Sequence, residues 1–255
     1  MMTVKAKKEL GQHFLTNKEI SLNIVNSLHP DKTRHIIEVG PGVGALTDFL
    51  KQRNNPLTLV EIDVDSVEYL KKKFSEKNII HADFLQLELK KLTIDPCAII
   101  GNFPYNISSQ ILFKIIDNRD VIFESVGMFQ KEVAERICSK PNSKKYGILS
   151  VLTQAYFNCE YLFEVSPDNF HPKPKVNSAV IKLTRNKTKK LACNHREFTQ
   201  VVKIGFNQRR KKLKNALKKF SNLDDSNLTS ILSKRAEELS VKDFIMLTNQ
   251  IFANS

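Results

Sequence analysis

The sequence is poor in the residues that mark unusual classes of protein. It contains no tryptophan, four cysteines, eight glycines and nine prolines among its 255 residues. So little glycine and proline argues against a collagen-like or low-complexity chain. The cysteines are too few for a disulfide scaffold and form no C-x-x-C pair, so we expect no metal site. Isolated thiols of this kind fit a reducing compartment.

Long apolar runs are also missing. No stretch of the sequence approaches the roughly 18 apolar residues that a membrane-spanning helix needs. The N-terminal segment carries charge but lacks the apolar core of a signal peptide: MMTVKAKKELGQHFL. We therefore expect a cytoplasmic protein with no membrane partner.

Acidic residues are outnumbered, and most of the excess positive charge lies near the C-terminus. Lys and Arg total 40 against 27 Asp and Glu, a formal net charge of +13. Residues 186–255 contain 15 basic and 6 acidic side chains and so contribute 15 − 6 = +9. Charge of one sign at this density favours a polyanion, although RNA, DNA and an anionic membrane surface all fit it. The apolar positions of residues 198–220 form a narrow helical stripe, which favours packing on a small helical core over membrane binding.

Short apolar runs alternate with amphipathic segments in the first half of the chain. This alternation predicts an α/β, Rossmann-like fold in which helices cover both faces of a parallel sheet. Beyond residue 188 the pattern is helical, with a break near Asn207 and Gln208. We therefore predict a main domain at residues 1–185 and a small, basic α-helical domain at residues 186–255. The expected strands of the main domain are 35–39, 57–62, 78–81, 97–100 and 125–129, and its expected helices are 45–53, 64–74 and 108–117.

A glycine-rich loop joins the first strand to the first helix of this pattern. Gly40, Gly42 and Gly44 lie in the segment I-I-E-V-G-P-G-V-G-A-L-T. Small residues let the chain turn sharply and let a ligand approach the backbone. The loop also fits the G-x-G-x-x-A pattern of nicotinamide dinucleotide enzymes, and a simple tight turn would look the same.

Three acidic residues follow successive strands and help to choose the cofactor. Glu38 would repel a pyrophosphate but attract a cation such as the α-amino group of S-adenosylmethionine (SAM). Glu61 ends the next strand, where an acid can bond ribose hydroxyls, and Asp83 could accept a hydrogen bond from an adenine amino group. The carboxyl ends of these strands therefore indicate a SAM site.

The tetrapeptide Asn102-Phe103-Pro104-Tyr105 indicates the reaction. It resembles the N/D-x-P-Y/F motif of SAM-dependent amino methyltransferases. The side-chain oxygen of Asn102 and the carbonyl of Pro104 can accept hydrogen bonds from the weakly nucleophilic amine of adenine and hold it in line with a methyl donor. Tyr105 offers a stacking face for an extruded base.

With these motifs in order, the chain resembles the bacterial ribosomal RNA adenine dimethyltransferase (KsgA/RsmA) family from about Lys8 to Leu217. Two positions depart from the family pattern: His13 replaces Asn, and Phe103 replaces Leu with its side chain expected in the core. The matching segments are Gly11–Leu15, Glu38–Gly44, Glu61–Asp63, Asp83, Asn102–Tyr105, Gln130–Val133, Pro141–Lys144, Tyr146–Gly147, Phe170–Val176 and Phe206–Lys211.

The resemblance implies a role for each matched residue. Phe170 would stack on the target base and act in catalysis with Asn102, Pro104 and Tyr105. The basic charge of the C-terminal segment, rather than the resemblance, leads us to expect RNA binding by Arg209, Arg210, Lys211 and Lys212. The implied SAM-binding residues are His13, Leu15, Glu38, Gly40, Gly42, Glu61, Asp83 and Asn102.

The implied substrate is a pair of adjacent adenosines in a hairpin loop near the 3′ end of small-subunit (16S) ribosomal RNA, within an immature 30S particle. We expect the enzyme to be a monomer that acts in ribosome biogenesis. The nearest rival family is that of the erythromycin-resistance (Erm) methyltransferases, which modify large-subunit RNA; Phe206–Lys211 and Gln130–Gly147 favour the small-subunit enzyme.

Three more distant functions also deserve comparison with the sequence: a mitochondrial transcription-factor relative, a non-catalytic assembly factor and a dehydrogenase. The N-terminus lacks the character of a transit peptide, which argues against the first. The intact Asn102–Tyr105 motif argues against the second. A dehydrogenase would explain neither that motif nor the basic C-terminal segment.

Overall fold

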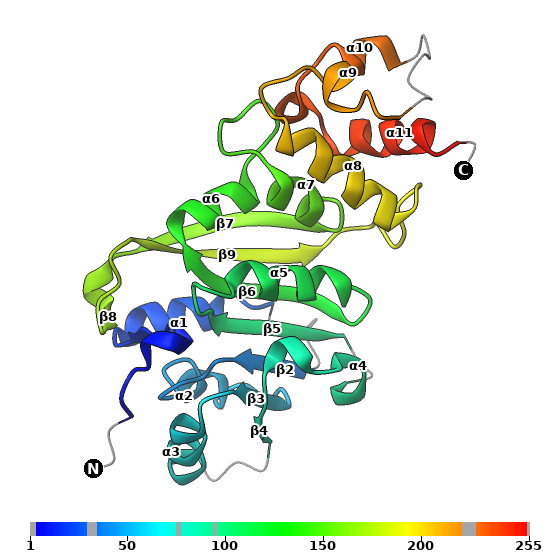
Figure 1. Ribbon diagram of the computed structural model, residues 1–255. Helices are drawn as coiled ribbons and strands as arrows, with labels where there is room; N and C mark the ends of the chain where they lie inside the picture. Colours follow the sequence, from blue (N-terminus) through cyan, green and yellow to red (C-terminus); the bar gives the residue numbers. More distant parts are fainter. Residues whose placement is uncertain (1–3, 30–34, 75–77, 94–95, 221–227, 254–255) are drawn as a thin grey trace. The chain divides into compact units, whose positions relative to one another are not determined.

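The structure is a computed structural model that describes residues 4–29, 35–74, 78–93, 96–220 and 228–253. Its chain packs as two compact units (Figure 1). Unit 1 contains Met1–Ala134 and Cys159–Arg185, and unit 2 contains Glu135–Asn158 and Asn186–Ser255. In the described residues, no helix is both long and apolar enough to cross a membrane.

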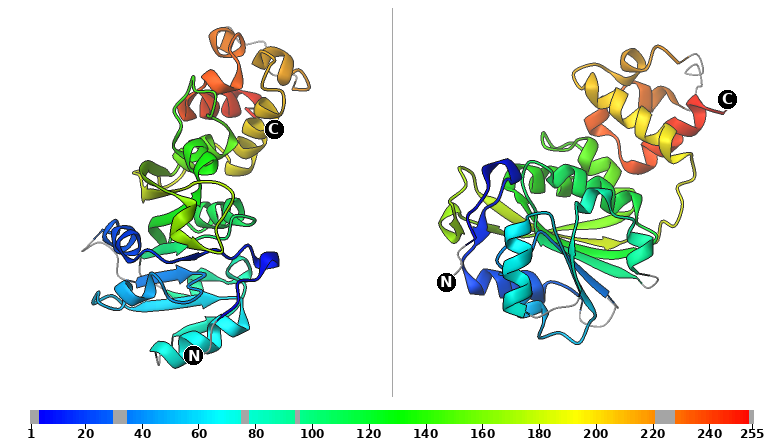
Figure 2. Two further views of the ribbon diagram at one scale, coloured as in Figure 1. Left: turned by 90° about the vertical axis from the view of Figure 1, so that its left-hand side faces the viewer. Right: turned by 60° about the horizontal axis from the view of Figure 1, so that its bottom comes forward.

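Unit 1 is built on a seven-stranded sheet with helices on both faces (Figures 1 and 2). The strand order is β4-β3-β2-β5-β6-β9-β7; neighbours from β4 to β6 are parallel, and β9 is antiparallel to β6. The strands are β2 (His35–Val39), β3 (Leu57–Glu61), β4 (Ile79–His81), β5 (Cys97–Asn102), β6 (Ile122–Gln130), β7 (Phe157–Val165) and β9 (Ser178–Arg185). The expected Rossmann-like α/β fold is therefore confirmed.

The helices of unit 1 pack on the sheet through apolar stripes. Beneath α1 and α2 the sheet presents Ile36, Ala98, Ile100, Val126 and Met128, all buried in one cluster. The helices are α1 (Lys18–Asn26), α2 (Thr47–Leu50), α3 (Val64–Phe74), α4 (Leu89–Leu92) and α5 (Ser108–Asp117), and the 3₁₀ turns are η1 (Lys8–Leu10), η2 (Phe84–Gln86) and η3 (Pro167–Asn169). Helix α6 (Lys131–Cys138) begins in unit 1 and ends in unit 2.

A second, two-stranded sheet lies beside the large one in unit 1. It pairs β1 (Phe14–Leu15) with β8 (Phe170–His171) in antiparallel register, and Leu15 lies opposite Phe170. Strands of two residues have no periodicity, which is why the sequence pattern did not predict them.

Among the described residues of unit 2, the regular structure is helical apart from the start of β7. It contains α7 (Ile148–Gln154), α8 (His195–Asn207), α9 (Leu213–Ala216), α10 (Thr229–Leu232), η5 (Ala236–Glu238) and α11 (Val241–Ile251). The end of α8 at Asn207 confirms the break predicted there.

The two units differ from the expected domains in one respect. The expected domains and the observed units both have a boundary between Arg185 and Asn186. Residues 135–158, however, pack with the C-terminal helices rather than with the rest of the main domain. Buried Tyr146 contacts Phe206 edge to face at 6.0 Å between ring centroids, and the Tyr156 hydroxyl lies 2.9 Å from Nδ1 of His195. Contacts between residues so distant in the sequence leave no local pattern.

Candidate SAM and adenine site

The candidate site is a pocket at the carboxyl ends of β2, β3 and β5. The strand order reverses between β2 and β5, which is where open α/β sheets bind their ligands. The N-terminal segment Leu10–Phe14 covers one side of the pocket, and Asn102–Tyr105 forms another. The remaining lining residues are Val39, Gly40, Gly42, Val60, Glu61, Ile62, Ala82, Asp83, Phe84 and Ile107.

The glycine loop is held by Glu61. Gly40 and Gly42 have φ values of 67° and 56°, in the left-handed region that glycine adopts most readily. A Cβ on Gly42 would lie 2.8 Å from the ring of Phe14, so only glycine leaves room there. The main-chain nitrogen of Gly42 donates to Oε2 of Glu61 at 2.9 Å.

Glu61 also orders the turn after its own strand. Its Oε1 accepts hydrogen bonds from the main-chain nitrogens of Ile62 and Asp63, both at 3.0 Å. Burial raises the pKa of Glu61, and the bonds from Asp63 and Gly42 oppose that shift. A carboxylate fixed at the end of β3 inside the pocket fits a ribose hydroxyl.

Glu38 lies beside the main pocket, in a smaller hollow that it lines with Leu15, Gly40 and Asn102. Its carboxylate is fully buried and accepts a 2.6 Å hydrogen bond from the hydroxyl of Thr47. Burial raises the pKa of Glu38 to about 8, although the bond from Thr47 lowers it. A ligand cation would favour the ionised form, which fits the α-amino group expected here.

Asp83 lies where the chain leaves β4 and lines the pocket with Ala82 and Phe84. It caps η2, because its Oδ1 accepts a 2.9 Å bond from the main-chain nitrogen of Leu85. The glycine loop, Glu61 and Asp83 therefore fit SAM: they offer a close backbone approach and carboxylates for its ribose and adenine.

Asn102 is held with its carbonyl oxygen available to the pocket. Its Nδ2 donates a 2.7 Å hydrogen bond to the main-chain oxygen of His13. A carbonyl can only accept, so the amide nitrogen has to face His13 and Oδ1 has to face away. The carbonyl of Pro104 accepts from the nitrogen of Ile107 at 3.2 Å and keeps a second lone pair.

The two aromatic residues of the tetrapeptide have different surroundings. Phe103 is 1% exposed and packs edge to face on Phe129, as expected of a core residue. Its ring has room because residue 127 is glycine: a Cβ at that position would lie 2.2 Å from the ring. Tyr105 lines the pocket and its hydroxyl bonds to that of Ser178; burial raises the pKa of Tyr105, while this bond lowers it.

His13 joins three parts of the site. Its ring stacks on Tyr105 with 5.5 Å between centroids, and its Nδ1 lies 2.7 Å from the main-chain oxygen of Pro172. The main-chain oxygen of His13 also accepts the hydrogen bond from the Asn102 side chain. His13 therefore contacts both Asn102 and Tyr105. His13 was expected to bind SAM; the structure places its ring in the pocket, stacked on Tyr105.

Leu15 and Phe170 lie apart from the main pocket. They are opposite each other in the β1–β8 pair, and they are 4% and 3% exposed within the apolar core. Leu15 still lines the smaller hollow beside Glu38. Phe170 has no open face for stacking in this conformation, so the predicted contact with a base needs its ring to leave the core.

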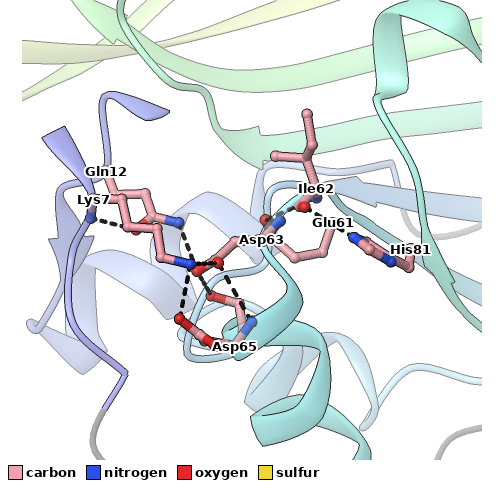
Figure 3. Close-up of polar contacts among 8 residues, drawn as sticks. Lys7, Gln12, Glu61, Ile62, Asp63, Asp65 and His81 are labelled. Atoms are coloured by element: carbon pink, nitrogen blue, oxygen red, sulfur yellow. Dashed lines mark hydrogen bonds and ion pairs between the residues drawn. The ribbon is translucent and has the colours of Figure 1, made fainter. Parts of the chain in front are cut away.

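A polar cluster ties the N-terminal segment to the turn after β3 (Figure 3). The ammonium of Lys7 pairs with Asp63, which is fully buried, and with Asp65 at 2.8 Å. The side chain of Gln12 donates to Asp63 at 3.2 Å and accepts from the main-chain nitrogen of Lys7 at 2.8 Å. These contacts hold the segment that covers the pocket. Lys7 was not predicted from the sequence, because its partners lie more than 50 residues away.

The four basic residues expected to bind RNA lie in unit 2. Arg210, Lys211 and Lys212 are exposed. Arg209 instead pairs with Glu237 and donates to the main-chain oxygen of Ser143 at 3.3 Å. In the described part of the chain, no three His, Cys, Asp or Glu side chains gather as a metal site would require.

Comparisons with known proteins show which family the chain resembles. The family model for ribosomal RNA adenine dimethylase matches residues 3–252. The ribosomal RNA small subunit methyltransferase A of Phocaeicola vulgatus is 51% identical over 259 residues, covering 99% of this chain and 92% of that protein. The protein of the same name from Cytophaga hutchinsonii is 51% identical over 255 residues, covering 98% and 99%.

Solved structures share the fold. A dimethyladenosine transferase from Plasmodium falciparum superposes with a TM-score of 0.78 at 24% identity, over 93% of this chain and 97% of that one. The 23S rRNA methyltransferase ErmE superposes with a TM-score of 0.71 at 25% identity, over 94% and 99%. These findings confirm the class I SAM-dependent methyltransferase fold and SAM as the cofactor. The chain belongs to the ribosomal RNA adenine dimethylase family.

Proposed function

We propose that this enzyme dimethylates N6 of two adjacent adenosines in the hairpin loop near the 3′ end of small-subunit (16S) ribosomal RNA. The small-subunit relatives, about half identical over nearly the whole chain, support this substrate over the large-subunit RNA of the Erm enzymes. The protein acts in the cytoplasm, as a monomer, on an immature 30S particle.

The orientation of Asn102 carries the proposal. Its Oδ1 and the oxygen of Pro104 accept the two hydrogens of the target amine and so direct the nitrogen lone pair at the methyl donor. SAM supplies an electrophilic methyl group on a sulfonium. With SAM bound, Asn102 and Pro104 would keep the amine nitrogen directed at that methyl group, and the proton that the nitrogen loses would pass to solvent.

The basic surface of unit 2 supports RNA as the substrate. Arg210, Lys211 and Lys212 are exposed and would contact phosphates, which position an RNA without reading its sequence. Specificity would then come from the RNA fold and from the bases that enter the pocket of unit 1. Phe170 would stack on such a base only after leaving the core.

Nucleoside mass spectrometry tests the proposal. The protein and SAM are incubated with unmethylated small-subunit particles and, in parallel, with large-subunit RNA. We expect N6,N6-dimethyladenosine in the small-subunit sample alone. Product only in large-subunit RNA would reverse the assignment, and no product in either sample, despite SAM binding, would favour an assembly factor.

A further inference from the structure

Three segments of unit 2 that are far apart in the sequence meet at Arg209. The guanidinium pairs with Glu237 through Nε and donates to the main-chain oxygen of Ser143 through a terminal nitrogen. The main-chain nitrogen of Asn142 in turn donates to the main-chain oxygen of Glu237 at 2.8 Å. Arg209 and Glu237 thus connect the loop at 139–147, the segment after α8 and the turn η5.

Exposed cations flank this connection on every segment. Lys140 and Lys144 belong to the loop, and Lys234 and Arg235 immediately precede η5. Arg210, Lys211 and Lys212 follow Arg209 directly and are also exposed. None of these seven side chains forms an ion pair with another described residue, in contrast to Lys145, which pairs with Glu135 at 2.6 Å.

Arg209 itself is poorly placed to contact a phosphate. Its side chain is 37% exposed, and its charge is balanced by Glu237, whose side chain is 28% exposed. The planar guanidinium reaches two acceptors at once, which the single ammonium of a lysine does less well. The contacts therefore suit Arg209 to holding chain segments together.

These contacts help to hold the loop in its shape. Asn142 has a φ of 69°, a left-handed conformation that is uncommon for a residue other than glycine and that asparagine tolerates best. The bond from Asn142 to Glu237 and the bond from Arg209 to Ser143 fix two consecutive residues of the loop. Lys140 and Lys144 lie within two residues of these anchor points.

We propose that Arg209 and Glu237 form a clamp that assembles a three-segment cationic surface for RNA phosphates, and that Arg209 does not contact the RNA. The surface comprises Lys140, Lys144, Arg210, Lys211, Lys212, Lys234 and Arg235. The inference rests on the proposed function, since it takes ribosomal RNA as the ligand. It adds the loop and the η5 segment to the surface and makes Arg209 a positioning residue.

Removal of a single acid distinguishes the clamp from a simple charge effect. Glu237→Ala deletes a negative charge close to the RNA, which by electrostatics alone would tighten binding. The clamp predicts the opposite, because Arg209 loses the partner that orients it and therefore holds Ser143 and the loop lysines less firmly. Glu238→Ala is the matched control: this exposed neighbour bonds the main chain of Arg235 and does not touch Arg209, so RNA binding should be unchanged or tighter.

The measurement is the Kd for a fluorescent transcript of the 3′ domain of small-subunit RNA, as a function of KCl concentration. Each phosphate contact contributes about 0.9 to the slope of log Kd against log salt. We expect Lys140→Ala with Lys144→Ala to lower the slope by about 2. Glu237→Ala should cause a similar loss, and adding it to the lysine pair should cause little more. Arg209→Lys, which keeps the charge, should weaken binding as Glu237→Ala does.

Tighter binding by Glu237→Ala, or wild-type binding by Arg209→Lys, would overturn the clamp. The clamp would also be overturned if the loss of RNA affinity caused by Glu237→Ala added fully to the loss caused by the Lys140→Ala, Lys144→Ala pair. Circular dichroism and the SAM Kd show that each variant is folded. Dimethyladenosine formation by the wild-type protein is assayed separately: its absence would count against the proposed function, whereas the RNA-binding pattern decides the clamp.

Discussion

The side-chain nitrogen of Asn102 donates a hydrogen bond to the main-chain oxygen of His13, which lies 89 residues earlier in the chain. The N-terminal segment that covers the pocket therefore also sets the orientation of the Asn102 amide, which we propose acts in catalysis. The same segment is tied by Lys7 and Gln12 to Asp63 at the end of β3. The segment that covers the pocket and the side chain of Asn102 are thus connected to each other and to the end of β3.

Asn102→Ala should abolish most turnover while leaving SAM binding nearly unchanged. Loss of one preorganised acceptor costs about 10²–10³ in kcat in comparable sites. The test combines single-turnover methylation with isothermal titration of SAM. Turnover within a few-fold of wild type would remove Asn102 from the catalytic role, and loss of SAM affinity would make it a cofactor residue.

His13→Ala should lower kcat by about tenfold or more, because Tyr105 loses its stacking partner and Pro172 its hydrogen-bond donor. His13→Asn keeps a donor and should recover more activity than His13→Phe, which keeps only the ring. The kcat and KM for RNA are compared with the SAM Kd. If all three variants lose activity equally, and a weaker SAM Kd explains the whole loss, then His13 acts only on the cofactor.

Asp63→Asn should weaken SAM binding by about tenfold, since the cover loses its ion pair with Lys7. Glu88→Gln, which removes an exposed i,i+3 pair with Lys91, serves as the control and should have no effect. Burial alone would raise the pKa of Asp63, but Lys7, Gln12 and Ser66 lower it overall. The stabilisation from Asp63 is therefore present above its unfolded pKa of 3.8 and lost as the pH falls through its lower folded value. The rate of SAM dissociation is measured by stopped flow. An unchanged rate in Asp63→Asn would contradict a role for this ion pair in holding the segment over the pocket.

Glu38→Gln should flatten the dependence of stability on pH. The folded pKa of about 8 lies above the unfolded value of 4.5, so the folded state holds the proton more tightly. Glu38 thus favours folding fully below pH 4.5, and that contribution is lost as the pH rises to about 8. Urea unfolding from pH 5 to 9 measures the difference. An equally steep decline in Glu38→Gln would assign the pH dependence to other groups.

Phe170→Ala should reduce the free energy of unfolding by about 3–5 kcal/mol, because it empties a buried site in the core. Phe170→Leu fills most of that space and should remain folded. If the ring moves out to stack on the target base, the leucine variant should lose activity on RNA well beyond its loss of stability. Normal kcat/KM for RNA in Phe170→Leu would restrict Phe170 to packing.

Local patterns predicted the parts of the site that lie next to one another in the sequence. The glycine loop, the acids at or just beyond the ends of β2, β3 and β4, and the Asn102 tetrapeptide each lie at the carboxyl end of a recognisable strand. The sheet therefore brings them to one edge without further information. The break near Asn207 and Gln208 was likewise predicted, and α8 ends at Asn207.

Contacts between distant segments were not predictable in this way. The ring of His13 meets Pro172, which is 159 residues away, and Phe170 is buried by pairing with Leu15. Arg209 looked like one more exposed cation until folding placed Glu237 beside it. A one-dimensional pattern shows charge and spacing but not which partner neutralises or covers a side chain.

The most direct test is to count the dimethyladenosines that form on each small-subunit particle and map them. We predict two per particle, adjacent in the 3′-terminal hairpin loop, with almost none formed by Asn102→Ala under the same conditions. A single modified adenosine, product outside that hairpin, or full activity of Asn102→Ala would contradict it.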